Sequence, residues 1–176
     1  MADFEVITEG KINNNTTNNI SFTSIPQTYQ HLEVTFSWRS YATTGDVYVY
    51  ARLNGKTGTE YATAGFILLD SQSSILRYTA YEDTEAFGNA GTMAASDSGA
   101  GAFSAATMMI PNYTDTSQHK LMMTRGAQGQ GSTADGMTFA VCSSVSDTAA
   151  VTQLDVYPYT GHYASGTTYM LAGYKG

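Results

Sequence analysis

The sequence predicts an all-β protein, an antiparallel β-sandwich of jelly-roll-like architecture with an extended N-terminal arm. The composition supports this fold class, since 13 Tyr, 7 Phe and 17 Gly among 176 residues supply strand-forming side chains and turn formers. Several segments alternate apolar and polar residues with the period of two that half-buried strands show. No segment carries the period of an amphipathic helix, which argues against a parallel βαβ arrangement.

The two clearest strands lie between residues 31 and 53. In His31–Trp38 one face carries the apolar residues Leu32, Val34, Phe36 and Trp38. In 46–54 one face carries Val47, Val49, Ala51 and Leu53, and the opposite face carries Tyr48, Tyr50 and Arg52. Because only the short turn segment 42–46 separates these strands, we predict that 31–53 form a β-hairpin or an adjacent strand pair.

Weaker patterns bring the expected total to nine or ten strands. They cover 4–8, 20–23, 75–81, 103–110, 120–125, 137–145, 151–157 and 167–174. In 137–145 we expect Met137, Phe139 and Val141 to point inward, and Cys142 to behave as a small buried apolar residue. Short strands separated by Gly, Asn, Asp and Ser are typical of a sandwich or jelly roll.

Three segments lack a strand pattern. Residues 84–101 and 126–136 are rich in glycine and are expected to be long loops, which in compact domains are usually functional or disordered. Residues 11–19 hold five Asn and are expected to form an arm that carries a short N-terminal strand. We therefore divide the chain into 1–19, the N-terminal strand and Asn-rich arm, and 20–176, the sandwich domain.

The charge balance excludes several classes of partner. Lys and Arg number 8, Asp and Glu number 15, and the formal net charge is -7, so we expect neither nucleic-acid binding nor adsorption to anionic membranes. The single cysteine excludes an intrachain disulfide and a cysteine-cluster metal site. Residues 1–5 lack the features of a secretion signal, and no apolar stretch is long enough to span a membrane.

The search for catalytic and metal-binding patterns finds no convincing set. His31, His119 and His162 have no partner at the spacing of H-E-x-x-H, and G-x-S-x-G is absent. The glycine-rich run 126–131 lacks the Lys-Ser/Thr that a phosphate-binding loop needs. We expect no catalytic residue, no metal site and no cofactor.

The densest acidic cluster consists of Glu82, Asp83 and Glu85. We interpret it as a solvated turn, since the alternating ligand positions of a calcium loop are absent. A cation site, a subunit contact and the acid/base pair of a glycan depolymerase are the alternatives.

Tyrosines favour an interaction surface. Tyr48 and Tyr50 lie opposite an apolar face, and further tyrosines crowd the last fifth of the chain. Tyrosine is enriched at interfaces because it offers a large contact area at low entropic cost. Two alternatives are a sheet face that carries tyrosines because they fit the pleat, and a platform on which sugars stack. The candidate interface residues are Phe4, Val6, Ile7, Tyr48, Tyr50, Tyr157, Tyr159 and Tyr163.

A succession of short motifs runs from about residue 20 to residue 173. Its members are 25–32 (IPQTYQHL), 54–61 (NGKTGTEY), 110–113 (IPNY), 147–152 (DTAAVT), and Gly161 with 166–173 (GTTYMLAG). In order and spacing this succession resembles a family of small virion structural proteins and domains of tailed bacteriophages, common among phages of cyanobacteria and other aquatic bacteria. The usual ending has Tyr before the last Gly, where this chain has Ala172.

The resemblance implies a virion structural protein with a jelly-roll-like sandwich. Such domains occur as decoration (cement) proteins on capsids and as parts of tail fibres. The short chain, its low charge, and an arm able to add a strand to a neighbour's sheet favour decoration. We expect a non-enzymatic homotrimer on the capsid exterior that binds the major capsid protein. The alternative is a tail-fibre or receptor-binding domain that contacts host surface polysaccharide.

Overall fold

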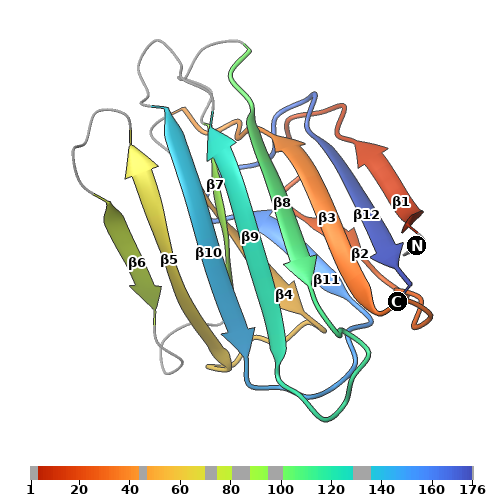
Figure 1. Cartoon of the computed structure of the whole chain (residues 1–176). Helices are drawn as coiled ribbons and strands as arrows, with labels where there is room; N and C mark the ends of the chain where they lie inside the picture. Colours follow the sequence, from red (N-terminus) through yellow and green to blue (C-terminus); the bar gives the residue numbers. More distant parts are fainter. Residues whose placement is uncertain are drawn as a thin grey trace.

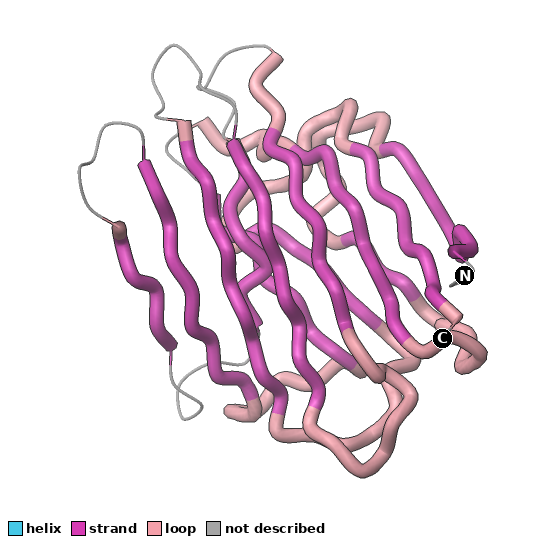
Figure 2. Tube along the Cα trace, viewed as in Figure 1, coloured by secondary structure: helices cyan, strands magenta, loops and turns pink. Residues whose placement is uncertain are grey.

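The computed structural model describes residues 4–43, 47–69, 75–80, 88–94, 101–128 and 136–175. These residues form strands joined by loops and turns, with no helix among them (Figure 2). The strands are β1 (Phe4–Lys11), β2 (Ile20–Phe22), β3 (His31–Trp38), β4 (Val47–Leu53), β5 (Tyr61–Leu69), β6 (Leu76–Ala80), β7 (Gly88–Met93), β8 (Ser104–Ile110), β9 (Lys120–Gln128), β10 (Met137–Val145), β11 (Leu154–Pro158) and β12 (Thr168–Tyr174).

The strands build two antiparallel sheets that pack face to face, so the predicted β-sandwich is confirmed. The larger sheet has eight strands in the order β1-β12-β3-β8-β9-β10-β5-β6. The smaller sheet has four, in the order β2-β11-β4-β7, and lies behind the larger one in Figure 1.

The path of the chain between the sheets is jelly-roll-like. From β2 to β5 successive strands alternate between the small and the large sheet, and β7 and β11 return to the small one. Without the hairpin β9–β10 and the strands β1 and β12, two four-stranded sheets remain, as in a jelly roll. The hairpin lies between β8 and β5 and widens the large sheet.

The predicted pairing of 31–53 is wrong. Both strands exist and bury the predicted apolar faces, but β3 pairs with β12 and β8, whereas β4 pairs with β11 and β7. The chain between them crosses from one sheet to the other. Both strands bury one face completely, and facing each other across the core achieves this as well as hydrogen bonding within one sheet.

Two strands escaped the sequence patterns. Strand β5 was missed because Ala62, Ala64 and Gly65 are small, so its first half shows no alternation of large apolar and polar residues. Strand β7 lies within the predicted loop 84–101 and has two glycines, so that prediction is wrong for 88–93. In the predicted loop 126–136, strand β9 continues to Gln128.

The N-terminal segment packs against its own chain. Strand β1 pairs with β12 at the edge of the large sheet (Figure 1). Beyond it, Ile12 is buried, and its amide donates to the Thr167 carbonyl oxygen at 2.8 Å. The Tyr163 amide donates to the Thr17 carbonyl oxygen at 2.8 Å. The expected extended arm therefore lies along the sandwich in this structure.

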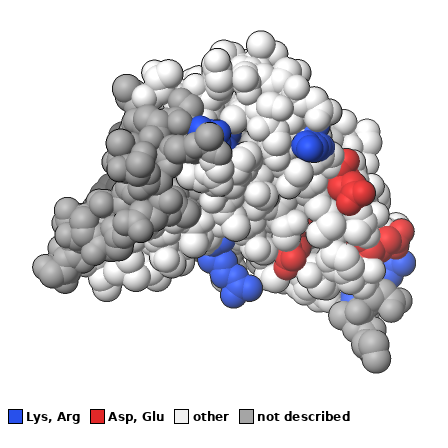
Figure 3. Space-filling view, turned by 90° about the horizontal axis from the view of Figure 1, so that it is seen from above, with Lys and Arg blue, Asp and Glu red and all other residues white. Residues whose placement is uncertain are grey.

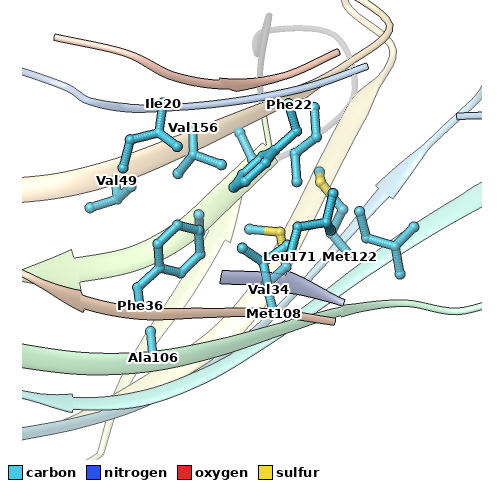
Figure 4. Close-up of a cluster of buried hydrophobic side chains, with 14 of the residues drawn as sticks. Ile20, Phe22, Val34, Phe36, Val49, Ala106, Met108, Met122, Val156 and Leu171 are labelled. Carbon is cyan, nitrogen blue, oxygen red and sulfur yellow. The ribbon is translucent and has the colours of Figure 1, made fainter. Parts of the chain in front are cut away.

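The core lies between the sheets. Ile20, Phe22, Val49 and Val156 of the small sheet face Val34, Phe36, Met108, Met122 and Leu171 of the large one (Figure 4). Trp38 is fully buried, stacks on Phe36 with 4.4 Å between ring centroids, and donates its indole N–H to the Thr92 carbonyl oxygen at 3.2 Å. This bond joins β3 to β7 across the sandwich.

Candidate interaction surfaces

The solvent side of the large sheet, called here the outer face, is defined by the register of its strands. Cross-strand partners share a face, and one such row runs Val6, Ala172, Glu33, Met109, Met123, Cys142 and Ala64 across seven strands. The next row contains Thr35, Thr107, Arg125, Ala140 and Phe66.

The outer face is apolar and carries little charge. Among the described side chains that β3, β8, β9, β10 and β5 turn outward, only His31, Glu33 and Arg125 are acidic or basic. Large hydrophobic side chains are exposed there, including Phe66, Leu68, Met109, Leu121 and Met123, and Met123 is 50% exposed. A groove of about 820 Å³ crosses β8, β9, β10 and β5, with Ile75 at its side.

The end of the sandwich that is uppermost in Figure 1 also carries few charged side chains. Seen from above, Lys, Arg, Asp and Glu side chains occupy separate small patches on a mostly uncharged described surface (Figure 3). Exposed large hydrophobic side chains grouped on one face, as on the outer face, commonly mark a protein–protein or ligand-binding surface.

Cys142 lies on the outer face, so its predicted burial is wrong. Its neighbours Val141 and Ser143 point inward and are buried, and the pleat turns Cys142 outward. Partial burial among its neighbours raises the pKa of the thiol.

The outside of the small sheet carries a tyrosine cluster. Tyr50 of β4 and Tyr157 of β11 are cross-strand partners with ring centroids 6.2 Å apart at 69°. The ring of Tyr159, just beyond β11, packs edge-to-face on Tyr50 at 5.4 Å. Tyr159 is 64% exposed, whereas Tyr50 is 7% exposed. Burial raises the pKa of the Tyr157 hydroxyl.

The predicted interface residues fall into three groups. Phe4 and Val6 are exposed at the β1 edge of the outer face, and Ile7 packs against the core. Tyr48, Tyr50, Tyr157 and Tyr159 lie on the outside of the small sheet. Tyr163 is fully buried, and its hydroxyl donates to the Val156 carbonyl oxygen at 2.9 Å. A side chain without accessible surface cannot contact a partner, so the structure removes Tyr163 from the predicted set.

The outer-face residues were missed by the sequence analysis, although a signal for them exists. Met109 and Met123 stand at alternate positions beside the buried Met108, Met122 and Thr124. Two adjacent methionines on each strand therefore predict one inside and one outside.

The histidines lie apart. His31 begins β3 and accepts a hydrogen bond at Nδ1 from the Asn112 amide at 3.1 Å, His119 is exposed, and His162 follows a bend. In the described part of the chain no three His, Cys, Asp or Glu side chains gather as metal ligands. No helix there is long and apolar enough to cross a membrane. Glu82, Asp83 and Glu85 lie outside the described residues.

Comparison with known proteins gives no match, either to a protein-family model or to a curated protein.

Proposed function

We propose that this chain is a non-enzymatic structural protein of a phage virion, a capsid decoration protein whose outer face packs on the major capsid protein. The observation that carries the proposal is the weakly charged, exposed apolar surface formed by β3, β8, β9, β10 and β5 of the large sheet. A soluble monomer rarely leaves so large an apolar surface open. The sequence resemblance to virion structural proteins supplies the class of partner.

The size of the outer face suits a stable contact. Seven strands spaced about 4.8 Å apart, each about seven residues long, span roughly 800 Å². A standard interface buries about 800 Å² on each partner. The proposed contact therefore uses the sheet face, and the N-terminal segment, which pairs with β12, supports that face from its edge.

Cys142 provides a native probe for the test, because it is the only cysteine and lies in the central row of the outer face. A maleimide should modify Cys142 faster in the isolated protein than in assembled particles, because the bound capsid protein would cover the thiol. Equal rates in both states would contradict the proposed interface.

A substitution pair gives the second arm of the experiment. Met123→Glu places a carboxylate on the outer face and should lower occupancy on capsids by at least about tenfold, because burying an unpaired charge is costly. The control Gln118→Glu adds the same charge in an exposed turn away from this face and should leave occupancy unchanged. Equal incorporation of both variants would refute the assignment of the surface.

A further inference from the structure

A second surface, on the opposite side of the sandwich, has different chemistry. A groove of about 690 Å³ runs along the outside of β11, lined mainly by polar side chains from β2, β4 and the segments beside them. Asn19, Arg52, Gln153, Asp155, Tyr157 and Tyr159 are the lining residues that matter for its chemistry. None of them lies on the outer face, so an activity here does not depend on the proposed capsid contact.

A carboxylate in the groove is held in a fixed orientation. Asn19 donates its side-chain amide to one oxygen of Asp155 at 3.1 Å, and Gln153 donates to the other at 2.7 Å. A carboxylate has about four acceptor sites, so each oxygen can accept a further hydrogen bond. The side-chain amides of Asn19 and Gln153 each donate through nitrogen to Asp155, so their side-chain carbonyl oxygens remain as additional acceptors. The groove therefore presents several acceptors close together.

An aromatic platform adjoins this carboxylate. Tyr157 stands two residues after Asp155 on the same face of β11, and the Arg52 guanidinium lies 4.9 Å from its ring centroid. Tyr159 leaves most of its ring open while its edge rests on Tyr50. Its backbone is anchored by a 2.8 Å hydrogen bond from its amide to the Tyr48 carbonyl oxygen. The backbone hydrogen bond and the contact with Tyr50 therefore both restrict the position of Tyr159.

The combination narrows the class of ligand. The charges of the Asp155 carboxylate and the Arg52 guanidinium largely cancel. The groove therefore has no strong electrostatic preference for an anionic or a cationic ligand. A peptide that adds a strand would need an unpaired edge, whereas the groove runs over the face of β11, which is paired on both sides. Acceptors grouped beside an open aromatic ring match a ligand with adjacent hydroxyl donors and a flat C–H face.

We propose that this groove binds a neutral saccharide, whose pyranose ring stacks on Tyr159 while adjacent hydroxyls donate to the Asp155 carboxylate. Tyr157 and Arg52 form the wall beside the stacked ring. Asn19 and Gln153 act as positioning residues, because they fix the carboxylate and also offer their own oxygens.

The test uses the full chain on an array of neutral and uronic-acid-containing bacterial polysaccharides, followed by calorimetric titration with an oligosaccharide from the best-bound neutral polysaccharide. Tyr159→Ala and Asp155→Asn should each weaken binding by about tenfold. Asp155→Asn keeps the shape of the side chain but replaces one acceptor oxygen with an NH2 donor and removes the charge, so its effect does not arise from lost packing. The matched control Phe66→Ala removes an exposed aromatic ring from the outer face and should bind as the parent does.

Three outcomes would overturn the proposal. They are no binding of any neutral polysaccharide at a concentration of about 1 mM repeating units, preferential binding of the uronic-acid polymers, and binding that survives both groove substitutions.

The two proposals are tested independently, because Met123→Glu should lose capsid occupancy and keep saccharide binding. Tyr159→Ala should show the reverse.

Discussion

At the scale of single residues, Lys120 is a buried cation held by backbone oxygens. The side chain is 2% exposed, and its ammonium donates to the carbonyl oxygens of Asp115, Gln118 (2.8 Å) and Thr148 (3.1 Å). An ammonium has three donors, and all three are used. Lys120 therefore ties the turn before β9 to the loop after β10.

Replacing Lys120 tests that role. Lys120→Met keeps the approximate length of the side chain but leaves three carbonyl oxygens without their donor. We therefore expect the free energy of unfolding, measured in urea, to fall by about 2–4 kcal/mol. The control is Lys175→Met, since Lys175 is exposed and its ion pair with Glu5 spans 3.4 Å. That change should cost at most about 1 kcal/mol. Equal effects would mean that the three carbonyl bonds contribute nothing specific.

Cys142 and Tyr163 show what sequence reasoning could and could not establish for single residues. The alternation that correctly places Met137, Phe139 and Val141 inside also places Cys142 outside, so its predicted burial followed the average behaviour of cysteine against the local pattern. Tyr163 offered no such signal, because it lies between strands in an irregular segment. Its burial depends on packing against distant residues.

At the scale of elements, β7 and β9 are coupled through one aromatic ring. Phe139 of β10 fills the space beside Gly126 of β9 and beside Gly91 of β7, which has φ +110°. The register of the β4–β7 ladder shifts next to the Val49–Gly91 pair. The two glycines let the sheets approach over the ring, which explains why a glycine-rich segment forms a strand here.

Gly126→Ala tests this packing. An added Cβ would overlap the Phe139 ring and lie 2.5 Å from the Ala105 carbonyl oxygen, and overpacking of this kind costs about 1–3 kcal/mol. Chemical unfolding measures the loss, and Phe139→Leu in the same chain should recover part of it. The control Gly101→Ala meets nothing within 4 Å and should change stability little. Parent-like stability of Gly126→Ala would show that the contact is loose.

The elements that could be predicted are those with strict alternation. Strands β3, β4 and β10 carry apolar residues at every second position. In β5 the first half, and in β7 most of the strand, consists of small or polar residues, so no alternation marks them as strands. The strand partners of β3 and β4 could not be predicted from the sequence. A hairpin and a crossing between sheets bury the same alternating residues, and only the complete set of strands decides between them.

At the scale of the whole molecule, the sandwich separates two surfaces of different character. The large sheet turns outward a broad apolar face, and the small sheet turns outward a narrower, polar and aromatic one. The sequence predicted the tyrosines of the second surface. It did not predict the first, because that face depends on the register of seven strands from distant parts of the chain. A molecule bound by its large sheet would leave the saccharide groove facing away from the particle.

The number of copies per virion is the last expectation, and it follows from symmetry. Capsid lattices repeat their three-fold and quasi-three-fold positions over the whole shell, and a three-fold protein fits at each of them. A trimeric decoration protein bound there should be present in hundreds of copies, in a fixed ratio to the major capsid protein, as quantitative mass spectrometry of purified virions can measure. A few dozen copies or fewer would place the chain in the tail and leave saccharide binding as its leading role. Hundreds of copies with Cys142 still reactive would keep the location and move the contact to another face.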